Sequence, residues 1–384
     1  MADKFDKVLR DEPFSGYGEY MEYLFACVNM ALNEQLERMK LIFATGKGGY
    51  KNVLYPDLEV AEEICSKNIR DFQYKENREV QEADNGEVGE EISEDLLALF
   101  GDFVKETYGE KEEQEESELT SAKDRMEYIA YRAAKTAEQG ISLPFYELCR
   151  KLEMDTFTVF CFAGGILAST QTDYAGVFQV INENSSLLAP TIESAAKLYF
   201  GREFSISGSY GEMSNCLEQL MPVLNLHVQG NMPFSTVVSP DKRMIDYLFG
   251  KHPMRLDENY IRFFKMLTED SKLDPIMANE GILDAMKISY EEGVRIFSYY
   301  GDEGSGRKFF VKHFCQAKGL NAVSVNCKKL FVYDFQYVDK ALWAVTRECI
   351  LTNACLVLDE ISFREDESEK IYGYMDLAFG KIMT

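Results

Sequence analysis

A glycine-rich segment near the C-terminal end holds the residues best suited to bind a charged ligand. Its sequence is Gly301-Asp302-Glu303-Gly304-Ser305-Gly306-Arg307-Lys308. The G-x-x-x-x-G spacing is typical of a loop whose glycines let backbone N–H groups turn toward phosphate oxygens. The flanking residues predict a strand over 295–300 and a helix from Lys308, whose positive end would face the phosphates. We therefore expect a phosphate site formed by these residues: Gly301, Gly304, Ser305, Gly306, Arg307 and Lys308.

Two residues of this loop differ from the usual phosphate-loop motif. Arg307 stands where a lysine would reach the phosphates, and Lys308 stands where a Ser or Thr hydroxyl would bind Mg²⁺. Arginine keeps the positive charge but changes the geometry, because its planar fork differs from a lysine point charge. Taken alone, the segment also fits an ordinary glycine turn.

A second pair of reactive side chains, Asp359 and Glu360, follows the apolar run 355–358. The run predicts a buried strand that presents two carboxylates at its carboxyl end. Beside a phosphate loop, Asp359 would bind the Mg²⁺ shell, and Glu360 would be the catalytic residue that orients the attacking water. One strand–helix pair fits between the two motifs, so each supports the other. An ordinary strand end is the alternative for the acids alone.

Strand and helix patterns alternate around these motifs. The expected strands are 295–300, 322–327 and 354–360, and the expected later helices are 339–354 and 369–382. Alternation at this spacing predicts an α/β unit with parallel strands over 294–384. The preceding segment, 255–293, has a helical pattern and is expected to connect this unit to the rest of the chain.

The first 120 residues divide into helices and an acidic segment. Apolar residues at three- and four-residue spacing predict a helix over 15–44, and Pro56 marks the first turn of a second helix. We expect the TGKGGYK stretch at 45–51 to be a loop, because no Ser or Thr follows its lysine. Two acidic runs predict a mobile linker over 75–120, which leaves 1–74 as an N-terminal helical region.

Residues 121–254 are expected to form a middle domain of short helices. The first helix ends at Gly140, and the next two are separated by a turn at 153–155. An alternating pattern over 227–239 predicts a strand or wing. Further signals are helical patterns at 174–182 and 191–200, and a closing helix with Ser239 as N-cap, Pro240 at its first position and Gly250 after its end.

The composition narrows the class of protein. The 384 residues include 65 acidic and 41 basic ones, and the net charge of −24 disfavours nucleic acid and membrane as partners. The sequence lacks an 18-residue apolar run and a leader pattern, so we expect a cytoplasmic protein. The nine cysteines form no C-x-x-C pair and only three histidines are present, which disfavours a zinc site and indicates buried, reduced thiols.

Two parts of the chain resemble a known family. Residues 294–380 look like the core of an AAA+ ATPase, and the motifs that carry this resemblance are the glycine loop and the strand before Glu360. The middle region is similar to a winged-helix-like domain that precedes such a core in one group of bacterial AAA+ ATPases. This similarity is carried by SLPFYELCRKLEMDTFTVFCF, by TDYAGVFQVIN with APTIESAAKLY, and by VSPDKRMIDYLFG. The resemblance implies ATP and Mg²⁺ as ligands, a homo-oligomer in the full-length form, and a protein partner that is remodelled or assembled.

The expected fold is therefore multidomain. It is mainly α in the N-terminal and middle (winged-helix-like) regions, followed by a partial α/β P-loop (AAA+) core with parallel strands. The family's fourth and fifth strands, arginine finger and helical lid are expected to be missing, so the chain looks truncated within the core. Two function classes stay open: an ATPase, and a non-catalytic adaptor or protein-interaction module that keeps a degenerate core. For this chain we expect weak ATP binding and no hydrolysis.

Overall fold

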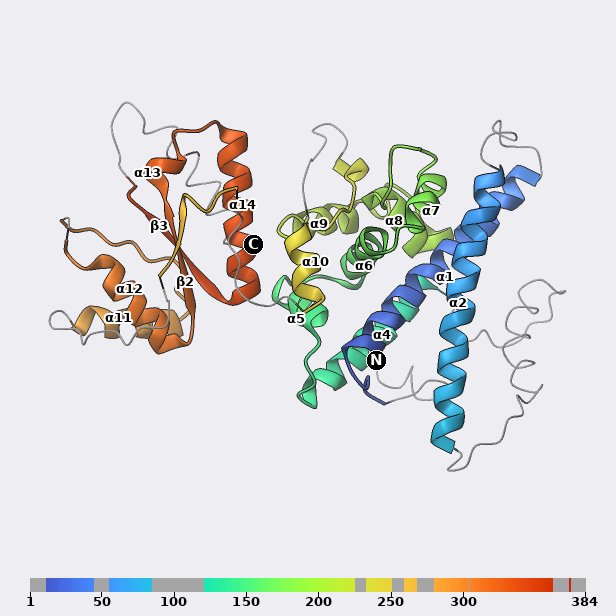
Figure 1. Ribbon diagram of the computed structural model, residues 1–384, viewed down its shortest axis with the longest axis horizontal. Helices are drawn as coiled ribbons and strands as arrows, with labels where there is room; N and C mark the ends of the chain where they lie inside the picture. Colours follow the sequence, from blue (N-terminus) through green and yellow to red (C-terminus); the bar gives the residue numbers. More distant parts are fainter. Residues whose placement is uncertain are drawn as a thin grey trace. The chain divides into compact units, whose positions relative to one another are not determined.

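A computed structural model describes most of the chain: residues 12–44, 55–84, 121–224, 233–250, 259–267, 280–302, 304–361 and 373. These residues are mainly helical, with a small three-stranded mixed sheet toward the C-terminal end (Figure 1). None of the helices among them has the length and apolar character needed to cross a lipid bilayer. The chain divides into two compact units, which we call the N-terminal unit (1–149, 153–220 and 225–240) and the C-terminal unit (150–152, 221–224 and 241–384).

Three long helices open the N-terminal unit at positions that the sequence predicts. They are α1 (Tyr17–Ala44), α2 (Tyr55–Asp84) and α4 (Ala122–Glu138). Ser121 is the N-cap of α4, and its hydroxyl accepts a hydrogen bond from the backbone N–H of Asp124 at 3.1 Å. Gly140, with φ of +80°, follows the end of α4, where a left-handed residue is favoured.

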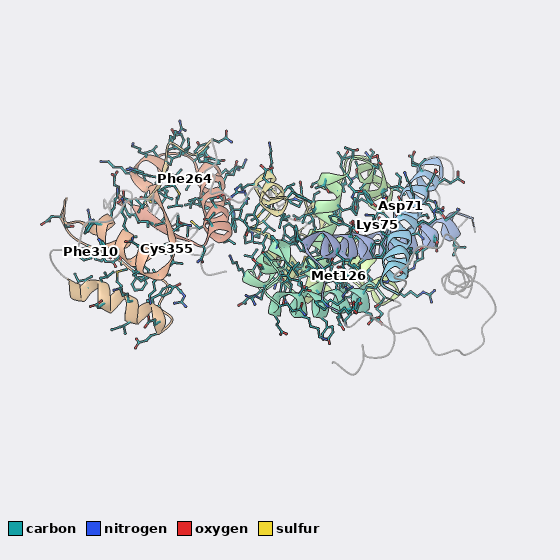
Figure 2. The ribbon with its side chains drawn as sticks, turned by 60° about the horizontal axis from the view of Figure 1, so that its bottom comes forward. Asp71, Lys75, Met126, Phe264, Phe310 and Cys355 are labelled. Atoms are coloured by element: carbon teal, nitrogen blue, oxygen red, sulfur yellow. The ribbon has the colours of Figure 1, made fainter. Side chains whose placement is uncertain are left out.

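The helix α2 extends into the segment predicted as an acidic linker. It continues through Asp84, and Lys75 pairs there with Glu22 of α1 at 2.7 Å; Figure 2 labels Lys75. The first ten residues of the predicted linker are therefore helical. The remainder, 85–120, and the loop predicted at 45–51 lie outside the described residues.

A buried arginine lies between these helices and the segment before them. Arg132 of α4 is 1% exposed, and its guanidinium lies 4.1 Å from the centre of the Phe14 ring. Its Nη2 donates to Oε1 of Glu19 at 2.8 Å, and its Nε donates to the carbonyl oxygen of Glu12 at 2.8 Å. Because a buried charge is costly unless it is paired and hydrogen-bonded, Arg132 fixes the chain before α1 to α4.

Shorter helices follow. They are α5 (Pro144–Lys151), α6 (Thr156–Thr170), α7 (Tyr174–Ile181), α8 (Ile192–Phe200), the 3-10 helix η2 (Gly201–Glu203) and α9 (Tyr210–Leu220). The predicted turn between α5 and α6 is confirmed. Glu153 has φ of +52°, and the Asp155 carboxylate accepts from the backbone N–H of Thr158 at 2.7 Å. Thr191 begins α8 in a reciprocal capping box with Ser194.

The strand or wing predicted over 227–239 does not form in its described part. That part contains a short 3-10 helix, η3 (Pro233–Ser235), and an isolated antiparallel bridge between Thr191 and Val237. Residues 227–232 lie outside the described residues. Alternating residue types favour a strand only where a second strand accepts its hydrogen bonds, and one bridge does not provide that partner.

The closing helix, α10 (Lys242–Leu248), begins later than predicted. Its N-cap is Asp241 and not Ser239, because Asp241 is extended and its carboxylate accepts a backbone hydrogen bond from the first turn at 2.8 Å. Pro240 therefore lies before the helix rather than at its first position. Gly250 follows the end of the helix with φ of +99°, as predicted.

Gly165 lets the backbone at Val238 pack directly against α6. A Cβ atom at position 165 would lie 2.5 Å from the Val238 carbonyl oxygen and 2.9 Å from Val238 Cγ1. We expect Gly165→Ala to lower the free energy of unfolding by about 1–3 kcal/mol, because an added methyl group in a packed core forces the backbone to move. Urea unfolding followed by far-UV circular dichroism would measure the change.

Gly176→Ala in α7 is the matched control. A Cβ atom at position 176 would meet no described atom within 4 Å. This substitution should raise the free energy of unfolding by up to about 1 kcal/mol, because glycine in a helix loses more conformational entropy on folding than alanine does. Equal stabilities of the two variants would contradict the close packing at Gly165.

The C-terminal unit is built on three strands in the order β1-β2-β3. They are β1 (Phe264–Met266), β2 (Asn321–Asn326) and β3 (Ala354–Asp359). The predictions of β2 and β3 are confirmed, and these two strands are parallel. However, β1 precedes the predicted α/β unit and runs antiparallel to β2, so the sheet as a whole is mixed. This strand lies in the segment 255–293, which was predicted to be helical, so that prediction is wrong at 264–266; three residues are too few to show the period of a strand.

Helices cover both faces of this sheet (Figure 1). One face packs on α14 (Phe335–Thr352), and the other packs on α11 (Glu280–Glu291) and α12 (Arg307–Lys318); a short helix, α13 (Cys327–Leu330), follows β2. The side chains toward α14 are Val323, Val325, Leu356 and Leu358, and those toward α12 are Ala322, Cys355 and Val357. Successive residues of β2 and β3 thus alternate between two helical layers.

The strand predicted over 295–300 does not form, and the described residues do not show a P-loop core. Its side chains still alternate, since Phe297 and Tyr299 pack against the cluster beside α12 while Ile296 and Tyr300 are exposed. A strand also requires a neighbour for its N–H and C=O groups, and apolar alternation cannot supply one. The helix predicted over 369–382 lies outside the described residues, apart from residue 373.

Candidate functional site

The glycine-rich segment forms an exposed turn that leads into α12. Gly304 and Gly306 have φ of +83° and +79°, in the left-handed region that favours glycine. Gly306 is the N-cap of α12, which begins at Arg307, one residue before the predicted start. Glu303 lies outside the described residues. Because the first N–H groups of a helix have no acceptor within the helix, this turn presents donors to a ligand.

Gly301 lies close to the side chain of Ser305 within the turn. A Cβ atom on Gly301 would lie 2.8 Å from Oγ of Ser305. The backbone N–H of Ser305 donates to the carbonyl oxygen of Asp302 at 3.1 Å and closes the turn. The described residues of the loop are therefore folded compactly on one another.

Asp359 is the last residue of β3 and lies on the loop side of the sheet. It follows Cys355 and Val357 on the face that α12 covers, because side chains alternate along a strand. Its carboxylate forms an ion pair with the ammonium group of Lys308, in the first turn of α12. The structure thus brings together the glycine loop and the strand-end acid, two motifs that the sequence places far apart.

A pair of thiols holds the other end of α12 against β3. Cys315 is buried and hydrogen-bonded to Cys355, which Figure 2 labels; this hydrogen bond and burial raise the pKa of Cys315 above its ordinary value. The helix rises about 10 Å from Lys308 to Cys315. The strand rises about 13 Å from Cys355 to Asp359. These similar lengths match a helix that runs antiparallel to the strand, with one contact at each end.

Glu360 is held by Asn326, a residue that the sequence analysis missed. Asn326 ends β2 and lies opposite Asp359 in the parallel register. Its Nδ2 donates to Oε2 of Glu360 at 2.9 Å, and its Oδ1 accepts from the backbone N–H of Lys329 at 2.9 Å. The signal available in the sequence was a polar side chain at the carboxyl end of the neighbouring predicted strand. Glu360 itself has φ of +56°, which is uncommon for a residue with a side chain.

The thiol beside these acids is protonated at neutral pH. Burial, followed by the negative charge of Asp359, raises the pKa of Cys327 to about 12. A protonated thiol is a poor nucleophile and a poor metal ligand. The chemistry of this site therefore belongs to its carboxylates, its two adjacent cations and the N–H groups of the turn.

The residues present fit a phosphate group but not Mg²⁺. The turn combines a helix N-terminus with two positively charged residues, Arg307 and Lys308, in the first turn of the helix, and this combination suits an anion. Mg²⁺ requires oxygen ligands in near-octahedral geometry. Here Asp359 is paired with the Lys308 ammonium, Glu360 accepts a hydrogen bond from the Asn326 amide, and position 308 supplies no hydroxyl. Within the described ranges, no group of three or more His, Cys, Asp or Glu side chains is placed to hold a metal.

Comparison with known proteins adds no relative to this picture. The chain matches no protein-family model, no curated protein and no solved structure at a significant level.

Proposed function

We propose that this chain is an ATP-binding protein of the AAA+ type that binds nucleotide without turning it over and contacts a protein partner. The observation that carries the proposal is the Lys308–Asp359 ion pair, which joins the glycine loop to the carboxyl ends of two parallel strands. Ligands of open α/β sheets bind outside that end of the strands. Residues 294–380 resemble an AAA+ core, and from this resemblance we expect that the nucleotide is ATP and that the chain contacts a protein partner.

The turn before α12 would bind the phosphates. Backbone N–H groups of the first helical turn donate to phosphate oxygens, and the helix dipole favours their negative charge. The guanidinium of Arg307 adds charge-assisted hydrogen bonds, each contributing about 1.5–3 kcal/mol. The net charge of −24 opposes a further anion, so the affinity is expected to be weak.

Two contacts favour the non-catalytic class, an adaptor or protein-interaction module. Glu360 would have to orient the attacking water, yet its carboxylate accepts the hydrogen bond from Asn326. Asp359 would have to bind the metal shell, yet it is paired with Lys308. Phosphoryl transfer depends on the positioning of metal, loop and water, so both contacts oppose it.

Arg307→Ala tests the nucleotide site directly. We expect it to weaken ATP binding by about 10- to 100-fold, the size of one lost hydrogen bond to a charged group. Isothermal titration calorimetry with ATP would measure the two dissociation constants. Arg202→Ala is the matched control, because it removes an exposed arginine from the N-terminal unit and changes the net charge equally. That variant should bind ATP as the unaltered chain does.

A phosphate-release assay separates the two function classes. The unaltered chain should release no phosphate above the buffer rate, and Glu360→Gln should leave this result unchanged. Turnover that Glu360→Gln abolishes would instead establish an ATPase. Absence of ATP binding at millimolar nucleotide would reject the proposed function altogether.

A further inference from the structure

We infer that the Lys308 ammonium takes the place of the magnesium ion at this site, so that ATP binds here without a divalent cation. The inference rests on the proposed function and specifies the form of its ligand. The chain would select the uncomplexed ATP anion over the magnesium complex that phosphate-loop proteins ordinarily bind.

Lys308 occupies the position in the loop where a phosphate-loop protein ordinarily has its Mg²⁺-binding hydroxyl. Two residues after the last glycine of an ordinary phosphate loop's G-x-x-x-x-G frame, a Ser or Thr hydroxyl binds Mg²⁺. In this chain that residue is Lys308, and its Nζ pairs with Oδ2 of Asp359, the carboxylate that would otherwise serve the metal shell. A fixed monovalent cation therefore lies between the loop and the strand end, where the divalent one would be.

The exposure of the pair leaves room for a ligand. The Lys308 side chain is 51% exposed, whereas that of Asp359 is 20% exposed. An ammonium group has three donors, so one can bond to the carboxylate while others point toward solvent and a phosphate oxygen. Arg307, adjacent in the chain, adds a second positive charge. Two such charges neutralise phosphate oxygens as a bound metal would.

A divalent ion and the Lys308 ammonium would compete for the carboxylate of Asp359. A divalent ion beside this carboxylate would have to displace the ammonium and then remain close to it. Like charges repel, and the repulsion grows where the surroundings are partly shielded from water. The nearby Glu360 carboxylate is already engaged by Asn326. ATP that carries Mg²⁺ would therefore place the metal beside the Lys308 ammonium, and the two cations would repel each other.

Calorimetric titration of ATP into the full chain, in EDTA and in excess Mg²⁺, tests this inference. We expect binding in EDTA to be at least as tight as binding with Mg²⁺. Lys308→Thr, which restores a hydroxyl, should weaken binding in EDTA by about tenfold or more. In that variant, added Mg²⁺ should recover the affinity, so the dependence on metal would reverse.

Two further variants guard against an effect on folding or on net charge. Lys318→Thr removes a lysine from the far end of α12, where it pairs with the exposed Glu291, and should bind ATP as the unaltered chain does. Asp359→Asn removes the competing partner of Lys308 and should tighten binding in EDTA, the opposite direction to Lys308→Thr. Circular dichroism spectra should be the same for all variants.

The outcomes separate the inference from the proposed function. If the unaltered chain binds ATP only with Mg²⁺, the nucleotide site stands and the role assigned to Lys308 is wrong. The same conclusion follows if Lys308→Thr binds equally well in EDTA. If ATP binds under neither condition, the proposed function fails and the inference fails with it.

Discussion

Replacing Glu348 by alanine is expected to lower the free energy of unfolding of the C-terminal unit by about 3–5 kcal/mol. Glu348 lies in α14 and is 2% exposed, and its two carboxylate oxygens accept from Nε and Nη2 of Arg243, each at 2.8 Å. Without Glu348 the guanidinium of Arg243 would keep its charge in a largely buried place. Asp241, another carboxylate of this unit, already pairs with Arg347 at 2.7 Å.

The single tryptophan offers a local measurement of this loss. Trp343 lies in α14, so its fluorescence during urea unfolding reports on the C-terminal unit. Asp284→Ala is the control, because it breaks an exposed pair with Lys287 and should change stability by less than about 0.5 kcal/mol.

A double replacement shows whether the loss comes from the buried charge of Arg243. Replacing both Arg243 and Glu348 by methionine removes the two charges together and should recover most of the stability, because apolar groups can substitute for a buried pair. If Glu348→Ala behaves like the exposed control, the buried pair contributes little and this account is wrong.

Arg132→Leu is expected to have an effect of similar size, about 3–5 kcal/mol, on the N-terminal unit. Leucine would leave the carboxylate of Glu19, which is 15% exposed, without its cation. It would also remove the planar group that lies 4.1 Å from the Phe14 ring and 4.6 Å from the Tyr23 ring. The segment before α1 would then lose the hydrogen bond from Arg132 to the carbonyl oxygen of Glu12 and the contact with Phe14, and α1 itself would lose the ion pair.

Far-UV circular dichroism during urea unfolding would measure this effect, because the N-terminal unit is helical. Arg38→Leu provides the comparison, since Arg38 is about one-third exposed and lies 3.9 Å from Glu34. We expect that substitution to cost no more than about 1 kcal/mol. Arg132→Lys should fall between the two, because lysine keeps the charge but cannot stack as a flat group. Equal losses for Arg132→Leu and Arg38→Leu would contradict the buried role.

Helices were the most predictable part of the fold. The helices α1, α6 and α8 follow from apolar spacing and from caps such as Asp155 and Thr191, because these signals lie within the helix or beside it. The position of the N-cap of α10 was harder to predict, since Ser239 and Asp241 are both good caps. Only the extended backbone at Asp241 decides between them.

Strand predictions succeeded only where a partner exists. The residue types over 295–300 resemble a strand as strongly as those of β2 do, but pairing is a property of two segments, and the sequence of one segment does not contain it. The short β1 shows the converse. Its residues carry no pattern, yet Phe264 pairs opposite Val325 because β2 offers a free side.

The sequence predicted that the glycine loop and the acids at 359 and 360 belong to one site, but not which side chains meet there. The glycines at 304 and 306 and the acid at 359 could be chosen from the sequence because each has a local physical reason. The contact between Lys308 and Asp359 could not, because it depends on how α12 packs along β3. Asn326 was missed for the same reason, since its neighbour Glu360 is brought near only by the parallel register.

Because helices cover both faces of the sheet, the number of residues between Cys355 and Asp359 in β3 decides which helical layer the Asp359 carboxylate faces. Asp359 reaches Lys308 because it shares a face with Cys355 and Val357. Gaining or losing one residue between Cys355 and Asp359 would turn the carboxylate toward the apolar α14 layer, whereas a change of two would keep it beside the loop. Among related chains that differ in the length of this strand, even differences are therefore compatible with the site and odd ones are not.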